Sequence, residues 1–377
     1  MRRVLHLIAL LAIALPAMAA WHAPDWTISL EERLVADDNI LRLSDSDRSR
    51  LKRDPSFQPD VEGAGALRVD HRLGLALQWR LRSRQGPFAA LQRWAGGRPG
   101  QGRLSLSWDG KWTQYEGSPA NTYASHRLSG AWQPRPGWGT ELNWRTLDNY
   151  YIRRFLDRDT GAERGATFDS DQIELVLKAR GPDRGPWLRQ PGLSLSAAWD
   201  RESYNPWFTE YDGEAWSLGL DLGWRMPAGL SAGLGWRFSD THNVGYTGSQ
   251  GVGTVNLGVD SEGGDGSHQE DQYSLSLGWS GRWGTRAAGL DAGLTLRDRW
   301  YQSRLGELQD PFHYGRHDRR ILLSLRGRLA LGASLTLIPV VEREWRDSEA
   351  AWGGISRVKD FEVLRAGLGL RWRLESD

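Results

Sequence analysis

The chain has 377 residues, no cysteine, 21 tryptophans, 45 glycines and a formal net charge of +1. Without cysteine it has no disulfide framework, so backbone pairing and burial must hold the fold. Balanced charge argues against a nucleic-acid-binding protein, because such proteins carry a strong basic excess on one face.

The N-terminal segment has the pattern of a secretory signal peptide. Arg2 and Arg3 precede an apolar stretch over residues 4–15, and Ala17-Met18-Ala19 matches a cleavage site with small residues. The apolar stretch is shorter than the ~20 residues that a spanning helix needs, so an uncleaved anchor is the less favoured alternative. We expect residues 1–19 to be a signal peptide and residues 20–377 to form a single exported domain.

After this segment, apolar and polar residues alternate to the end of the chain. Leu73 and Leu75 share one parity, for example, while Arg68 and Arg72 share the other. Successive side chains of a strand point to opposite faces, and most segments are close to the ~9 to 11 residues of a tilted transmembrane strand. We expect about fourteen strands, with twelve or sixteen as alternatives. They lie near residues 27–36, 67–83, 103–115, 123–133, 138–147, 168–179, 192–202, 214–226, 230–239, 272–280, 287–299, 319–331, 334–346 and 362–374.

The links between these segments alternate in length. Short links rich in turn-forming residues span 134–137, 227–229, 281–284 and 332–333, and long links span 37–66, 116–122, 148–167, 203–213, 240–271, 300–318 and 347–361. The link over residues 84–102 is long for its side, and one or two helical turns are expected after Pro87. Short periplasmic turns and longer external loops are typical of outer-membrane barrels. The sequence therefore predicts an all-β, transmembrane, antiparallel up-and-down β-barrel with both termini in the periplasm.

Tryptophans fall near the ends of the expected strands. Trp132 and Trp372 lie at periplasmic ends, whereas Trp216 and Trp300 lie at external ends. Tryptophan collects at membrane interfaces, so two belts at headgroup level are expected. A soluble β-sandwich with a tryptophan core is the alternative, but it would not account for the export signal together with loops of alternating length.

The polar parity of the strands carries about twenty Lys and Arg against about ten Asp and Glu. Since about eight strands already fill a barrel with side chains, fourteen should leave an open lumen. Basic linings favour anions, although a ladder of salt bridges that only stabilises the wall is the alternative. We expect Ser and Gly to form a smoother wall over residues 217–223, 231–235 and 274–280. The predicted pore-lining residues are Arg68, Arg72, Arg80, Arg82, Lys111, Arg127, Arg145, Arg297, Arg299, Arg320, Arg326, Arg328, Arg365, Arg371 and Arg373.

Six of these arginines are expected to form a collar at the periplasmic mouth, and the glycine-rich link over residues 240–271 is the alternative constriction. The collar consists of Arg80, Arg82, Arg326, Arg328, Arg371 and Arg373.

The histidines do not form an enzyme motif, because no His-Glu-x-x-His pattern occurs. His71 and His126 fall on the lipid-facing parity, and the spacing of His313 and His317 is commoner in solvated loops than in metal sites. We expect no catalytic activity, no metal and no cofactor.

The organisation as a whole resembles the porin class of Gram-negative outer-membrane barrels, and the arginine-lined lumen is similar to that of channels for acidic oligosaccharides. A short segment after the first strand resembles the opening of barrels associated with exopolysaccharide systems, where an acidic-Asn pair follows that strand. Asp and Asn also favour turns, so a plain strand end is the alternative. The segment is Leu34-Val35-Ala36-Asp37-Asp38-Asn39-Ile40.

These observations predict a channel in the outer membrane of a Gram-negative bacterium for passive diffusion of small, preferentially anionic solutes, with acidic sugars or oligosaccharides as candidate cargo. A component of exopolysaccharide export or of protein secretion and assembly is the second possibility, and a barrel enzyme is the third. The expected partners are outer-membrane lipids and lipopolysaccharide, the barrel-assembly machinery and an anionic small molecule or polysaccharide. No nucleic acid is expected to bind.

Overall fold

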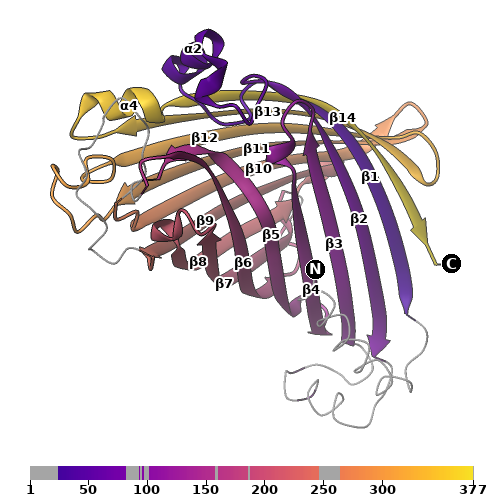
Figure 1. Cartoon of the computed structure of the whole chain (residues 1–377). Coiled ribbons are helices and arrows are strands. Elements are labelled where there is room, and N and C mark those ends of the chain that lie inside the picture. The colour runs from indigo at the N-terminus through magenta and orange to yellow at the C-terminus, as the bar shows by residue number, and fades with distance from the viewer. Residues whose placement is uncertain are drawn as a thin grey trace.

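The protein is described by a computed structural model that covers residues 24–81, 93, 96, 102–157, 160–185, 187–245 and 264–376. Fourteen strands of this part of the chain form one closed antiparallel barrel, in which β1 also pairs with β14 (Figure 1). The predicted up-and-down barrel of fourteen strands is confirmed. The predicted signal peptide, residues 1–19, and the helical turns expected after Pro87 lie outside the described residues.

The strands are β1 (Asp25–Asp37), β2 (Ala66–Leu81), β3 (Gly102–Tyr115), β4 (Tyr123–Arg135), β5 (Trp138–Leu156), β6 (Glu163–Arg180), β7 (Arg189–Tyr204), β8 (Gly213–Arg225), β9 (Leu230–Asn243), β10 (His268–Trp283), β11 (Arg286–Tyr301), β12 (His317–Ala330), β13 (Leu335–Glu349) and β14 (Phe361–Glu375).

Alternating side chains give the barrel wall two chemically different faces. On β14, Leu364, Leu368 and Leu370 are about half exposed on the outside, whereas Arg365 and Arg371 lie on the opposite face. An outward apolar band with a polar interior is the pattern of a β-barrel in a lipid bilayer. No helix among the described residues has the length and apolar character to cross a membrane.

The hairpin of β5 and β6 is longer than predicted. Residues 148–167 were expected to form a loop, but the strands continue to Leu156 and from Glu163. The register shifts between Leu147 and Tyr150, where Asn149 has a φ of 54°. A β-bulge of this kind interrupts the alternation and bends the strand without ending the pairing. The prediction of a loop was wrong because the interrupted alternation resembles a strand end.

Strands β14 and β1 approach each other closely at Gly367. A Cβ atom added to Gly367 would lie 2.5 Å from the Leu34 carbonyl oxygen of β1, so only glycine fits this close approach. Side chains of β12 and β1 also meet on the lumenal face, because Arg326 Nη2 lies 3.6 Å from Glu31 Oε2 across two intervening strands.

A second close approach lies on the other side of the barrel. A Cβ atom on Gly219 of β8 would lie 2.5 Å from Ser196 Oγ of β7. Over these small residues Arg237 of β9 reaches Glu174 of β6, with 2.7 Å between Nη2 and Oε1. Because β14 and β7 are seven strands apart in a ring of fourteen, the two close approaches lie on opposite sides of the ring.

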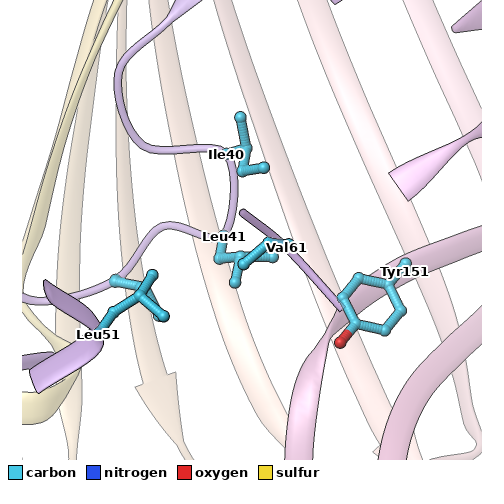
Figure 2. Packing of buried hydrophobic residues seen from close by; sticks show 6 residues of the cluster. Ile40, Leu41, Leu51, Val61 and Tyr151 are labelled. Carbon is cyan, nitrogen blue, oxygen red and sulfur yellow. The ribbon is translucent and has the colours of Figure 1, made fainter. Parts of the chain in front are cut away.

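The link between β1 and β2, residues 38–65, packs across the barrel from β14 to β5; we call it the crossing loop. It contains α2 (Asp45–Arg53) and the short 3-10 helix η2 (Pro55–Phe57). Its apolar side chains form a buried cluster with Tyr151 of β5 (Figure 2). The other loop considered as a constriction lies largely outside the described residues, over 246–263. The buried cluster consists of Ile40, Leu41, Leu43, Leu51, Val61 and Tyr151.

Candidate functional site

The lumenal face carries the basic side chains that the sequence pattern singled out. The register places Arg297 of β11 beside Arg320 of β12, and Arg320 beside Arg346 of β13, so three arginines form a row across the wall. Arg82 lies outside the described residues. The other predicted pore-lining residues lie on the strand face opposite the exposed leucines.

Most of these cations form ion pairs, and the carboxylates are shared. Five lumenal carboxylates each lie within 4.0 Å of two or three basic side chains. A carboxylate neutralises one unit of charge, so the clusters around Glu31, Asp70, Glu141 and Glu174 have a positive excess. The cluster around Glu344 is balanced, because its Arg365 also pairs with Asp37 and Glu342. The clusters are Glu31 with Arg33, Arg326 and Arg371; Asp70 with Arg68 and Lys111; Glu141 with Arg127 and Lys178; Glu174 with Arg145 and Arg237; and Glu344 with Arg42, Arg320 and Arg365.

The remaining predicted residues have one acidic partner each, apart from Arg297, which has no carboxylate within ion-pair distance among the described residues. The salt-bridge ladder considered as the alternative is therefore present, but it leaves basic charge in excess. The one-to-one pairs are Arg72 with Asp109, Arg80 with Asp25, Arg299 with Glu270, Arg328 with Asp291, and Arg373 with Glu375.

The cluster around Glu31 is the most strongly basic of these groups; we call it the Glu31 cluster. The Glu31 side chain is 4% exposed, and it accepts hydrogen bonds from Arg33 and from Arg371, whose Nε is 2.8 Å away. Arg326 is about one-third exposed, and its Nε and Nη2 have no hydrogen-bond partner among the described residues. Both nitrogens are buried, so the charge of Arg326 acts on an anion in the lumen through its electrostatic field.

The predicted collar is not a single cluster. Arg326 and Arg371 meet at Glu31, the middle residue of β1, whereas Arg328 pairs with Asp291 of β11. Sequence analysis also missed Arg33 and Arg42. The alternation along β1 could have identified Arg33 as lumenal. Arg42, however, lies in a loop, and no local sequence pattern predicts the path of that loop.

The crossing loop contributes Arg42 to the Glu344 cluster. Arg42 Nε lies 3.5 Å from Glu344 of β13, and its Nη1 lies 3.5 Å from the Tyr150 hydroxyl of β5. Five strands of the wall separate β5 from β13 through β1, so a single side chain that touches both reaches across part of the lumen. The loop thus narrows the passage at this level.

The acidic-Asn pair after β1 holds the crossing loop against β14. Asp38 Oδ1 accepts a hydrogen bond of 2.7 Å from the Leu364 amide. The fully buried Asn39 donates from Nδ2 to the carbonyl oxygens of Leu43 and Glu362, at 2.8 and 2.9 Å. The Leu43 amide donates back to Asn39 Oδ1 at 2.8 Å. These residues turn the chain from β1 toward the interior.

The opposite wall is smoother and carries acidic side chains. Ser196, Gly219 and Ser276 belong to the lumenal face of β7 to β10, where a cavity of about 400 Å³ lies. Asp200 and Glu202 of β7 have no basic side chain within ion-pair distance in the described part of the chain. A cavity of about 360 Å³ beside Arg72 and Arg127, among others, lies against the basic wall. The lumen therefore has a basic side and a small polar or acidic side.

The histidines considered as enzyme candidates contact acidic or aromatic side chains. His71 contacts Glu32 on the outer face, and His126 stacks on Trp108 with ring centroids 5.9 Å apart. In the link between β11 and β12, His313 Nδ1 lies 2.8 Å from Asp310. Burial raises the pKa of Asp310, but His313 and nearby hydrogen-bond donors outweigh it and hold that pKa below its ordinary value. No group of three or more potential metal ligands occurs among the described residues.

The closed barrel, its apolar outer band and its polar interior are those of an outer-membrane β-barrel. No protein-family model matches the chain, and no curated protein matches it.

Solved structures with a similar fold are outer-membrane proteins. A bacterial polysaccharide outer membrane secretin is 10% identical, with 92% of this chain and 98% of that chain covered and a TM-score of 0.44. OmpT of Vibrio cholerae is 9% identical, with 93% and 97% covered and a TM-score of 0.42. An anion-selective porin from Comamonas acidovorans is 9% identical, with 93% and 99% covered and a TM-score of 0.38. These likenesses concern the fold alone.

Proposed function

We propose that the protein is a channel for passive diffusion of small solutes across the outer membrane, with a preference for anions such as acidic sugars and oligosaccharides. The observation that carries this proposal is the sharing of each of four lumenal carboxylates, Glu31, Asp70, Glu141 and Glu174, by two or three cations. The positive excess lies inside a low-dielectric wall, where it raises the local concentration of anions and lowers that of cations.

Arginine makes this lining suited to carboxylates and phosphates. Its planar guanidinium offers parallel N–H donors that match two oxygens of such a group. Arg297 has no acidic partner among the described residues. A solute carboxylate can therefore pair with Arg297 without competing with a carboxylate of the described wall.

An export conduit for a charged polysaccharide is the second candidate. The observation that favours it is the crossing loop, since Arg42 reaches from β5 to β13 and narrows the external side. A conduit of this kind would stay nearly closed until a periplasmic partner engaged it. In either case we propose insertion by the barrel-assembly machinery, contact with lipopolysaccharide, and both termini in the periplasm. We propose no catalytic role, which an esterase or lipase assay on folded protein tests.

Uptake of three sugars of similar size into proteoliposomes tests the channel. Glucuronate, glucose and glucosamine differ mainly in charge, so size contributes little to any difference in rate. The proposal predicts that glucuronate enters fastest and glucosamine slowest. The reverse order would contradict anion preference. An export conduit predicts little flux of any of the three sugars and loss of surface polymer when the protein is deleted.

A further inference from the structure

Four aromatic side chains form a continuous row on the lumenal face of β4 to β7. The ring centroids of Tyr123 and Tyr150 lie 5.1 Å apart, those of Tyr150 and Phe168 lie 5.4 Å apart, and those of Phe168 and Tyr204 also lie 5.4 Å apart. We call Tyr123, Tyr150, Phe168 and Tyr204 the aromatic arc. The register explains its continuity, because Phe168 pairs directly with both Tyr150 and Tyr204.

The aromatic arc faces the lumen rather than the lipid. Phe168 shares its parity on β6 with Glu174 of the lumenal Glu174 cluster, whereas Ile173 and Leu175 of the other parity are exposed on the outside. The interior of an outer-membrane barrel is ordinarily polar, so four adjacent rings are an exception. All four are only half-buried, so part of their surface remains accessible.

The arc is distinct from the buried apolar cores around it. The crossing loop packs on Tyr151, which is 4% exposed, and the end of the β5–β6 hairpin packs through Phe155 and Phe208. None of the four rings belongs to the buried set of either cluster, but Tyr204 packs against the edge of the Phe155–Phe208 cluster. The exposed part of the four rings is available to a solute.

Basic groups lie beside the aromatic arc. Lys111 Nζ is 5.8 Å from the centroid of the Tyr123 ring, and Arg42 Nη1 is 3.5 Å from the Tyr150 hydroxyl. An aromatic face binds the C–H face of a sugar ring, and phenol hydroxyls can hydrogen-bond its hydroxyl groups. A neighbouring ammonium or guanidinium group would pair with a carboxylate carried by the same sugar.

We propose that the aromatic arc is a binding platform for the sugar rings of an anionic oligosaccharide, with Lys111 and Arg42 facing its acidic groups. This proposal rests on the proposed anion channel and specifies its solute class. A chain of sugar rings would pass along adjacent aromatic faces, whereas an inorganic anion would need only the basic clusters.

Current block in planar bilayers tests the platform, with trigalacturonate as the acidic probe and maltotriose as the neutral one. Trigalacturonate is expected to interrupt the current more strongly than maltotriose. Phe168→Leu keeps an apolar side chain but removes the aromatic face, so the Kd for block by trigalacturonate should rise about tenfold. Ser276→Ala, a small change on the opposite wall, is the matched control and should leave block unchanged.

Reversal potential in KCl without sugar separates the two proposals. Phe168→Leu should leave it unchanged, since the substitution alters no charge, and its value reports the anion channel alone. An absence of trigalacturonate block in the wild type, equal block by maltotriose, or unchanged block in Phe168→Leu would each overturn the sugar platform. Should Phe168→Leu fail to fold, Tyr204→Leu provides the same comparison at the neighbouring ring.

Discussion

Removing a cation from the Glu31 cluster and removing its carboxylate should shift ion selectivity in opposite directions. Arg326→Gln removes one of three cations, so anion preference should fall. Glu31→Gln removes the shared carboxylate and leaves three guanidinium groups, so anion preference should rise. Stability should respond differently from selectivity, because Glu31 is nearly buried and Arg326 is not.

The structure sets the magnitudes. At the 3.6 Å between Arg326 Nη2 and Glu31 Oε2, the Coulomb attraction is about 5 kcal/mol at an effective dielectric constant near 20 and about 1 kcal/mol in water. Arg326 donates no hydrogen bond to Glu31 and faces the lumen, so we expect Arg326→Gln to change the unfolding free energy by less than about 1 kcal/mol. Glu31→Gln removes the acceptor of two charged hydrogen bonds from the partly exposed Arg33 and Arg371 and should cost about 1 to 3 kcal/mol.

Two assays follow these effects separately. Reversal potential under a KCl gradient reports selectivity, and denaturant unfolding in detergent reports stability. Arg343→Gln is the matched control, because Arg343 pairs with Glu362 on the outer face, where it is 58% exposed. The control should leave selectivity unchanged. A shift of both cluster variants in the same direction would refute the assignment of the Glu31 cluster to the conduction path.

Three further substitutions test the wall and the crossing loop. Leu368→Arg puts a charge on the outward face and should impair insertion by roughly 2 to 4 kcal/mol near the bilayer midplane, seen as loss of the heat-modifiable band, whereas Leu368→Met should insert normally. Gly367→Val should lower the folding yield because its Cβ atom would lie 2.5 Å from the Leu34 carbonyl oxygen, while Gly130→Ala, with no heavy atom within 4 Å of the added carbon, should fold normally. Asn39→Ala removes three hydrogen bonds worth about 1 kcal/mol each and should loosen the crossing loop, so single-channel conductance should rise; unchanged conductance would show that this loop does not limit the passage.

Alternation along the chain was sufficient to predict the fold. All fourteen strands were expected from their two-residue periodicity, because a strand with one face in lipid and one in water must alternate. The loop expected over residues 148–167 was wrong, since the bulge near Asn149 interrupts the alternation while pairing continues.

The arrangement of the lumen could be predicted only in part. The parity of β12 and β14 identified Arg326 and Arg371 as lumenal candidates, but their meeting at Glu31 joins strands that are not neighbours, β12 and β1, which leaves no periodic signal. Arg42 was missed for a related reason. Its position follows from the packing of the crossing loop between β14 and β5, which involves residues far apart in the sequence.

The reversal potential of the wild-type channel in a planar bilayer under a KCl gradient tests the central claim most directly. The basic excess of the lumen predicts a potential displaced toward the equilibrium potential of chloride, with the displacement shrinking as salt screens the clusters. A potential displaced toward that of potassium would contradict the account.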